Sequence, residues 1–364
     1  MLALDAAGWT DLLAIARAEQ MIGTLAHRLA GLPVPNAVAR ILDDARASAE
    51  QGRIVALWEA EMARRVLAAI GVPLVLLKGT AFVAAGLEAG RGRSIGDLDI
   101  LVPRDRIDAV ETALLAAGWE WVKPDPYDDE YYRRWMHELP PLIHRERDRM
   151  IDVHHTILPL TARITPDAGA LLEHSLALPP SVRFERSRET GSESDDTGFS
   201  TSAGGVEVHP ERLPWQAVEG PEANGIGEVR ILSPNDMLVH AAAHLFADGD
   251  LAGGIRNLWD VHCLVGQFGT GGLAERAAYH GLAKETARAL RLATALYGAG
   301  ARLNPADRLY LRRLTARDGW GWPTRPVTRL AFYIRSHWLR MPPAMLARHL
   351  WTKWRKGGAG PVSG

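Results

Sequence analysis

Two aspartates lie two residues apart in the stretch "DLDILV", Asp97 to Val102, whose other residues are apolar. Side chains two apart on a strand point to the same face, so we expect Asp97 and Asp99 to project together. Two like charges held that close repel each other unless a cation lies between them. Mg²⁺ or Mn²⁺ suits carboxylate oxygens, and Mg²⁺ usually binds one or two carboxylates plus substrate phosphates. The pair therefore predicts a metal platform for phosphoryl or nucleotidyl transfer.

A third carboxylate would complete a two-metal site, and Asp152 in "MIDVHH" is the best candidate. It stands alone among apolar neighbours on a predicted strand. In such a site, one ion activates the attacking oxygen and the other neutralises charge on the phosphates and leaving group. His154 shares the strand face of Asp152, where it is either a polar neighbour in the site or a structural hydrogen-bond partner.

The turn Lys78-Gly79-Thr80 follows an apolar run and opens a predicted helix, which places backbone N–H groups where a phosphate can bind. Lys78 adds a charge, Thr80 adds a hydroxyl, and Gly79 lets the phosphate approach the backbone. Arg93, ahead of the aspartate pair, can reach the same polyphosphate. Lys-Gly is often only a turn, and Asp-x-Asp is common on solvated strands. The order of turn, helix, aspartate pair and later buried aspartate is what predicts a site.

Short strands and helices must position these residues. The apolar run "VPLVLL", residues 72–77, predicts a buried strand, and residues 97–102, 119–122 and 149–157 predict three more. A Trp/Tyr-rich connection separates the last two strands. Apolar residues at helical spacing predict helices within residues 1–70, 80–87 and 105–118. This order predicts a mixed sheet with helices, in an α/β or α+β domain.

The composition along the chain predicts five parts. Residues 1–70 form an N-terminal helical segment, 71–178 the catalytic core, and 179–228 a flexible loop rich in Pro, Gly, Ser and Glu. Residues 229–356 form a helical C-terminal domain whose first helix is capped by Ser233 or Asn235, and 357–364 a disordered tail.

The charge balance is close to neutral: 42 basic and 43 acidic residues argue neither for nor against a nucleic-acid partner. One cysteine, Cys263, excludes an intramolecular disulfide framework, and its apolar neighbours indicate a core position rather than a nucleophile. The N-terminal residues lack the basic-then-apolar order of a signal peptide, and no apolar run approaches the roughly 20 residues of a membrane span. We expect a cytoplasmic protein without a transmembrane segment.

The order of motifs resembles the DNA polymerase β-like nucleotidyltransferase superfamily, in which a Gly-Ser or Gly-Thr turn precedes Asp-x-Asp and a third acidic residue. More narrowly, the chain is similar to a bacterial family of uncharacterised nucleotidyltransferases. The segments that match, in that family's order over residues 74–265, are "LLKGTAF", "RSIGDLDILV", "ALLAAGW", "IDVHHTI", "LSPNDMLVHAAAHL" and "IRNLWDVHCLV". The chain departs from the superfamily in a longer interval between Thr80 and Asp97 and in threonine for serine.

The resemblance implies an α+β fold, a polymerase β-like mixed sheet with flanking helices followed by a helical C-terminal domain. It implies that Asp97 and Asp99 bind catalytic Mg²⁺ or Mn²⁺, that Asp152 is the third carboxylate, and that Gly79 with Thr80 holds nucleotide phosphates. The implied reaction moves NMP from an NTP such as ATP to an acceptor hydroxyl or phosphate, releasing pyrophosphate. The acceptor is a small molecule, peptide, protein or RNA.

The roles of three further residues can be interpreted in more than one way. His240 and His244 are four apart on a predicted helix, a spacing that lets two imidazoles share a metal, but no glutamate lies between them as a metalloprotease motif requires. Packing or a substrate-side role in the helical domain, together with Asp260 of "WDVHCLV", is the favoured interpretation.

The chain after Asp318 is basic and interleaves arginines and lysines with Trp338, Trp351 and Trp354. Such a pattern can bind nucleic acid or an anionic membrane surface. It can equally be a terminal helix that packs its tryptophans and keeps its cations solvated, which is the interpretation we favour. The alternative function is a non-catalytic nucleotide- or nucleic-acid-binding module that uses this tail.

Overall fold

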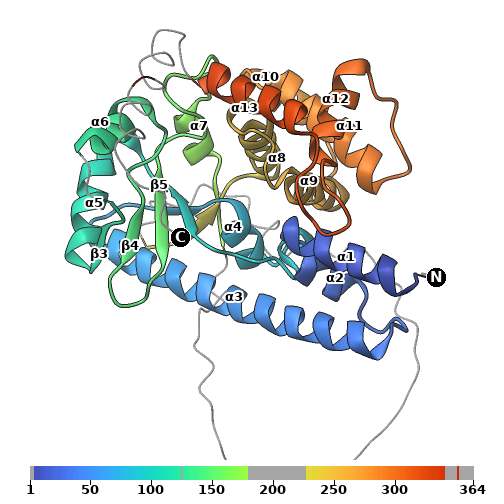
Figure 1. The fold of residues 1–364 in the computed structure, drawn as a ribbon. Coiled ribbons are helices and arrows are strands. Elements are labelled where there is room, and N and C mark those ends of the chain that lie inside the picture. Colours follow the sequence, from blue (N-terminus) through green and yellow to red (C-terminus); the bar gives the residue numbers. More distant parts are fainter. Residues whose placement is uncertain (1–3, 124–125, 179–226, 341–350, 352–364) are drawn as a thin grey trace, which may run out of the picture.

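The computed structural model describes residues 4–123, 126–178, 227–340 and 351. It is an α+β fold built on a mixed sheet, which confirms the fold class expected from the sequence. In Figure 1 the long helix α3 (Asn36–Ala69) runs below the sheet, and the helices from α8 (Pro234–Ala243) to α13 (Pro326–Arg340) gather above it and to its right. The expected loop, residues 179–228, lies almost entirely outside the described residues, as does the expected tail, residues 357–364.

Seven strands form the sheet in the order β3-β4-β5-β2-β1-β7-β6. Strands β2 and β5 are parallel neighbours, as are β1 and β7, and the remaining pairs are antiparallel. The strands are β1 (Leu74–Leu76), β2 (Leu98–Leu101), β3 (Trp119–Trp121), β4 (Leu142–His144), β5 (Met150–His154), β6 (Leu176–Ala177) and β7 (Val229–Ile231).

Helices of the first half surround this sheet. They are α1 (Ala6–Ala18), α2 (Ile22–Arg28), α3 (Asn36–Ala69), α4 (Lys78–Ala84), α5 (Ile107–Ala116), α6 (Pro126–Trp135) and α7 (Ala168–Glu173), with short 3₁₀ turns η1 (Glu88–Gly90) and η2 (Arg104–Arg106). Residues 1–70, expected to be helical, contain α1, α2 and α3, and α3 alone contains 34 residues.

Helices of the second half form the group above the sheet. They are α8 (Pro234–Ala243), the π-helical turn η4 (His244–Asp248), α9 (Gly254–Phe268), α10 (Leu273–Tyr279), α11 (Ala283–Tyr297), α12 (Pro305–Leu314) and α13 (Pro326–Arg340). Ser233 caps α8, because its side chain accepts a hydrogen bond from the backbone N–H of Asp236.

The central strands are buried along their whole length, which explains their unbroken apolar sequences. Every residue of β1 and of β2 is buried, including Asp99. Unbroken apolar runs therefore identify the central strands, and the period of 3.6 residues identifies the helices around the site. The division at residue 229 stays a prediction, and β7, at the start of that part, pairs with β1 in the sheet.

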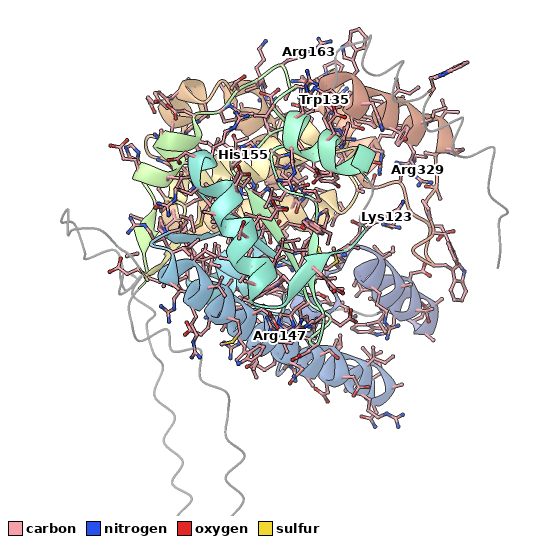
Figure 2. The ribbon with its side chains drawn as sticks, turned by 90° about the vertical axis from the view of Figure 1, so that its left-hand side faces the viewer. Lys123, Trp135, Arg147, His155, Arg163 and Arg329 are labelled. Carbon is pink, nitrogen blue, oxygen red and sulfur yellow. The ribbon has the colours of Figure 1, made fainter. Side chains whose placement is uncertain are left out.

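The connection before β5 contains two elements that the sequence pattern does not indicate, α6 and β4. The turn between β4 and β5 reaches back to α3, where Arg147 pairs with the buried Glu59 at 2.8 Å. The Arg147 guanidinium also stacks on the rings of Trp58 and Trp119, and Figure 2 shows Arg147 beside α3. Because β4 pairs with β5, this contact holds β5 and its carboxylate in place.

The described part of the basic C-terminal region packs against the helical group. In α13, Arg335 donates a hydrogen bond to the carbonyl of Phe246 at 2.6 Å, and Phe332 is buried. Trp338 is 45% exposed and contacts the guanidinium of Arg163. The expected pattern of packed tryptophans and solvated cations is not met at these residues: Trp338 and Trp351 are exposed, and Arg335 is held against the helical group. Trp354 lies outside the described residues. Among the described residues, no helix is long and apolar enough to cross a membrane.

Candidate active site

Three carboxylates meet where β2 and β5 run side by side. Asp99 on β2 and Asp152 on β5 are direct partners in the parallel register, and Asp97 comes immediately before β2. One oxygen from each carboxylate lies within 4.8 Å of the others. The sheet therefore brings together the three aspartates that the sequence analysis selected, and the parallel pairing of their strands is the reason.

The cluster holds like charges close together where they are poorly solvated. Burial, with the charges of Glu138 and Asp99, raises the pKa of Asp152 to about 7. Burial and Asp99 also raise the pKa of Asp97. Burial acts in the same direction on Asp99, but Lys78 and His154 outweigh it, so the pKa of Asp99 is lowered and this carboxyl stays ionised.

These carboxylates fit a hard divalent cation. One oxygen of Asp152, Oδ1, is buried and has no hydrogen-bond partner among the described residues. A buried carboxylate oxygen is costly unless a proton, donor or cation reaches it. Mg²⁺ and Mn²⁺ take oxygen ligands of this kind, and Asp97 is exposed at the edge of the cluster. Asp97, Asp99 and Asp152 are therefore the residues that can hold such an ion.

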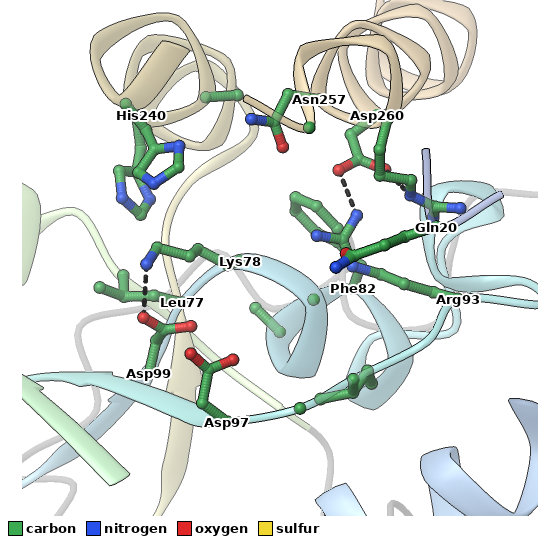
Figure 3. A pocket seen from close by; sticks show the side chains of 18 of the residues that line it. Gln20, Leu77, Lys78, Phe82, Arg93, Asp97, Asp99, His240, Asn257 and Asp260 are labelled. Carbon is green, nitrogen blue, oxygen red and sulfur yellow. Dashed lines mark hydrogen bonds and ion pairs between the residues drawn. The ribbon is translucent and has the colours of Figure 1, made fainter. Parts of the chain in front are cut away.

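Lys78 points toward this cluster from the first residue of α4. Its ammonium donates a hydrogen bond to Oδ1 of Asp99 at 2.5 Å, and Figure 3 shows the lysine between Asp99 and His240. Burial lowers the pKa of Lys78, but Asp99 more than reverses this effect, so the pKa is raised and the ammonium stays charged. The backbone φ of Lys78 is +47°, which is uncommon for a residue with a side chain and marks a constrained turn.

Gly79 and Arg93 lie against each other across the same space. A Cβ atom on Gly79 would collide with Nε of Arg93, so glycine is required for this approach. The guanidinium of Arg93 also contacts the ring of Phe82 and forms an ion pair with Asp260, which Figure 3 shows. The sequence analysis assigned Arg93 and Asp260 to separate parts of the chain, and the fold joins them.

Most of these residues line a cavity of about 650 Å³. Its lining includes Lys78, Gly79, Arg93, Asp97 and Asp99. Thr80 and Asp152 are not among the lining residues. The Thr80 hydroxyl is buried without a hydrogen-bond partner among the described residues, so the fold does not bring it to the cavity with its neighbours.

The opposite wall of the cavity comes from the helical part and from the N-terminal helices. His240, His244, Asn257, Asp260 and, from the turn after α1, Gln20 line it. Asp260 is 3% exposed and pairs with Arg256 at 3.1 Å as well as with Arg93. Sequence reasoning missed both amides: Gln20 lies in no motif, and Asn257 was not selected although it lies in the segment "IRNLWDVHCLV".

His240 and His244 face the cavity near Lys78 as neutral imidazoles. Burial, helped by the Lys78 ammonium, lowers the pKa of His244 to about 3 and that of His240 well below its usual value. Among the described residues, neither belongs to a group of ligand atoms close enough to share a metal. Their placement agrees with a substrate-side role. His240 lies in α8, and a π-turn begins at His244 directly after this helix; such turns often mark a functional site.

His154, two residues after Asp152 on β5, contacts Asp99 directly. Its Nε2 is 3.0 Å from Oδ1 of Asp99, and its Nδ1 is 3.4 Å from Oε2 of Glu138. Glu138 was not selected from the sequence, because the segment before β4 is interpreted there as a connection.

Cys263 is buried in α9, and burial raises the pKa of its thiol to about 12, which confirms its assignment to the core.

Gly79→Ala is expected to weaken NTP binding at least about tenfold, the equivalent of one charge-assisted hydrogen bond. The added methyl group displaces Arg93 from its position over Gly79. Equilibrium binding of a fluorescent NTP analogue measures the effect. Gly266→Ala is the matched control, because a Cβ at that exposed helical position meets no atom within 4 Å. If the two variants bound the NTP analogue with equal affinity, Gly79 and Arg93 would have no part in phosphate binding.

Asp152 is expected to give the metal-free protein a pH-dependent stability. Its pKa is about 7 when folded and near 3.9 when unfolded, so the folded state retains a proton between these values. Its contribution is therefore present below about pH 4 and is lost as the pH rises through about 7. Denaturant unfolding of wild type and Asp152→Asn should show wild type losing stability relative to the variant over this range. Saturating Mg²⁺ should remove that loss, and a pH-independent difference would contradict the shifted pKa.

The comparison with known proteins agrees with this geometry. The family model described as uncharacterised nucleotidyltransferase matches residues 5–181 and 200–298. These ranges contain the three carboxylates, the turn at Gly79, and Arg93 and Asp260 of the opposite wall. No curated protein and no solved structure matches the chain. Since the family model covers well over half of the sequence, the chain belongs to the family of uncharacterised nucleotidyltransferases.

Proposed function

We propose that the protein is a metal-dependent nucleotidyltransferase that moves NMP from an NTP to an acceptor hydroxyl or phosphate and releases pyrophosphate. The observation that carries the proposal is the meeting of three carboxylates where the parallel strands β2 and β5 lie side by side. Two of them open on a cavity that also holds a lysine and an arginine. In the reaction, an acceptor oxygen forms a bond to the α-phosphorus, and the bond to the oxygen bridging the α and β phosphates breaks.

Asp97, Asp99 and Asp152 are the proposed ligands of Mg²⁺ or Mn²⁺. When bound, such an ion supplies Lewis-acid polarisation of the phosphate oxygens and neutralises their charge. Asp97 offers an exposed carboxylate, and Asp99 is kept ionised by Lys78 and His154. Asp152, ionised once an ion is bound, is proposed to accept the proton of the acceptor hydroxyl.

Lys78, Gly79 and Arg93 form the proposed phosphate-binding end. Lys78 and Arg93 provide two positive charges, and Gly79 leaves room for a phosphate beside Arg93. Only the backbone of Thr80 is proposed to contribute there, because its hydroxyl is buried away from the cavity lining. Bidentate hydrogen bonds from arginine match phosphate geometry better than a point charge does.

The acceptor is proposed to enter along the wall formed by the helical part. Neutral His240 and His244 and the amides of Gln20 and Asn257 offer hydrogen bonds without net charge. This wall suits a polar acceptor and is compatible with a small molecule, a peptide, a protein or an RNA.

Incubation with each α-labelled NTP, Mg²⁺ or Mn²⁺ and a cell extract tests the proposal. We expect one NTP to label a defined acceptor, and a chelator to abolish the labelling. An intact chain that labels nothing with any of the NTPs would contradict it. Steep, salt-dependent RNA or DNA binding without NTP consumption would instead favour the alternative binding module.

A further inference from the structure

A second group of potential metal ligands lies beside the three aspartates. His137, Glu138 and His154 each bring one ligand atom, and these atoms lie within 4.8 Å of one another. The group is buried: His137 is 7% exposed, His154 is 2% exposed, and the side chain of Glu138 is 17% exposed. It shares no residue with the proposed ligands of the catalytic ion, and it uses a glutamate and a histidine from a segment that the proposed function leaves without a role.

The backbone holds the three side chains in place. Glu138 and His154 are partners in an antiparallel bridge. Leu139 donates its N–H to the carbonyl of Val153, and His155 donates its N–H to the carbonyl of His137, both at 2.9 Å. Residues directly opposite each other in such a pair project to the same side. Glu138 therefore faces His154 because of this pairing and not through a flexible surface contact.

The distances between the ligand atoms match a small tetrahedral ion. Oε2 of Glu138 is 3.4 Å from Nδ1 of His154 and 3.8 Å from Nε2 of His137. Bonds of about 2.0–2.2 Å in a tetrahedral zinc site place neighbouring ligand atoms about 3.3–3.5 Å apart. One distance has this value, and the other exceeds it by a few tenths of an ångström.

The hydrogen bond between His154 and Asp99 prepares His154 for metal binding. Asp99 is ionised and accepts only, so the nitrogen that faces it, Nε2, carries a proton. In a neutral ring this leaves a lone pair on Nδ1, which faces the carboxylate of Glu138. That nitrogen is buried and has no hydrogen-bond partner among the described residues. A carboxylate that fixes the tautomer of a ligating histidine is a recurrent feature of zinc sites.

Nδ1 of His154 and Oε2 of Glu138 are 3.4 Å apart. This spacing is longer than the about 2.7–2.9 Å of a charge-assisted N–H···O bond and suits two ligands of one ion.

We propose that His137, Glu138 and His154 bind a divalent transition-metal ion of the zinc type, separate from the ion held by Asp97, Asp99 and Asp152. Two imidazoles and one carboxylate are a donor set that favours zinc over magnesium. Three protein ligands leave a fourth position for water. The ion ties the segment before β4 to β5, and through His154 it orients the Asp99 carboxylate. His154 is thus a positioning residue.

Zinc binding to the full-length chain tests this site. Zinc chloride is titrated against a chromophoric chelator, without NTP and with Mg²⁺ in large excess to occupy the oxygen ligands. We expect one zinc per wild-type chain. His137→Gln and Glu138→Gln should each weaken zinc binding at least about tenfold. Co²⁺ in place of zinc should give the visible absorption of a tetrahedral site, and Glu138→Gln should abolish it.

Two controls separate this site from its surroundings. Asp97→Asn removes a proposed ligand of the catalytic ion, and His155→Gln changes the neighbouring buried histidine; both should bind zinc as wild type does. Circular dichroism confirms that each variant is folded. A wild-type chain that binds no zinc would overturn the proposal, as would unchanged affinity in both His137→Gln and Glu138→Gln. Loss of zinc in Asp97→Asn alone would place the ion at the aspartates. Since no NTP is present, the result is independent of the proposed transfer reaction.

Discussion

Asp97→Asn is expected to reduce NMP transfer about a thousandfold or more while the fold stays intact. The substitution keeps the size of the side chain and removes one charge from the proposed metal ligands, which costs several kcal/mol of transition-state stabilisation. Asp97 is suited to this test because it is exposed and lies outside β2, so its loss leaves the core unchanged. Asp99→Asn would be harder to interpret, since Asp99 is buried and bonded to Lys78 and His154.

The measurement for Asp97→Asn is the rate of label transfer from an α-labelled NTP, with thermal unfolding as the test of folding. Asp108→Asn is the matched control, because Asp108 has a side chain 92% exposed on α5, outside the cavity lining. Asp108→Asn should retain wild-type turnover. Wild-type turnover in Asp97→Asn would instead mean that the aspartate pair is not needed for the transfer reaction.

Asp260→Asn is expected to lower the free energy of unfolding by about 3–5 kcal/mol, the usual result of breaking a buried ion pair from one side. Asp260 is 3% exposed and is the carboxylate shared by Arg93 and Arg256. Arg256 is equally buried and also donates to Thr24 on α2 and to the carbonyl of Ala89. Without Asp260, a guanidinium stays buried with no carboxylate beside it.

Denaturant unfolding measures the effect of Asp260→Asn. Asp43→Asn is the control, because the Asp43–Arg46 pair lies on the surface, with side chains 65% and 44% exposed. Pairs of that kind contribute less than about 1 kcal/mol. A loss of similar size in both variants would mean that the Asp260 pairs do not stabilise the interface between α9 and the N-terminal helices.

The strands and the carboxylates could be predicted because their patterns are local. An apolar run bounded by turn residues identifies β1, and two aspartates in a strand stand out against apolar neighbours. Asp99 and Asp152 were selected separately, yet the prediction that they meet rested on the order of motifs. The parallel register of β2 and β5 supplies the physical reason.

The partners of those residues could not be predicted because they depend on contacts distant in sequence. Arg93 and Asp260 are joined only after α9 packs near the turn at Gly79. Glu138 lies in a segment rich in aromatic and charged residues, where β4 has three residues and offers no clear alternation. A strand this short is recognised from its pairing with β3 and β5 and not from its own sequence.

The N-terminal helices show how a region without a motif can still shape a site. The sequence predicts them only as a helical segment, and periodicity says nothing of where their ends point. In the structure the turn after α1 brings Gln20 to the cavity lining, with a backbone φ of +56°. Thr24 of α2 reaches the buried Arg256. Both contacts depend on the packing of helices, which composition cannot specify.

The most direct test of the proposed reaction compares two positions of the label in the same NTP. With the wild-type chain and its acceptor, label at the α-phosphate should join the acceptor, and label at the γ-phosphate should leave in pyrophosphate. Asp97→Asn should do neither at a detectable rate. Transfer of the γ-label to the acceptor, or transfer of the α-label at the same rate in Asp97→Asn and wild type, would contradict nucleotidyl transfer at these carboxylates.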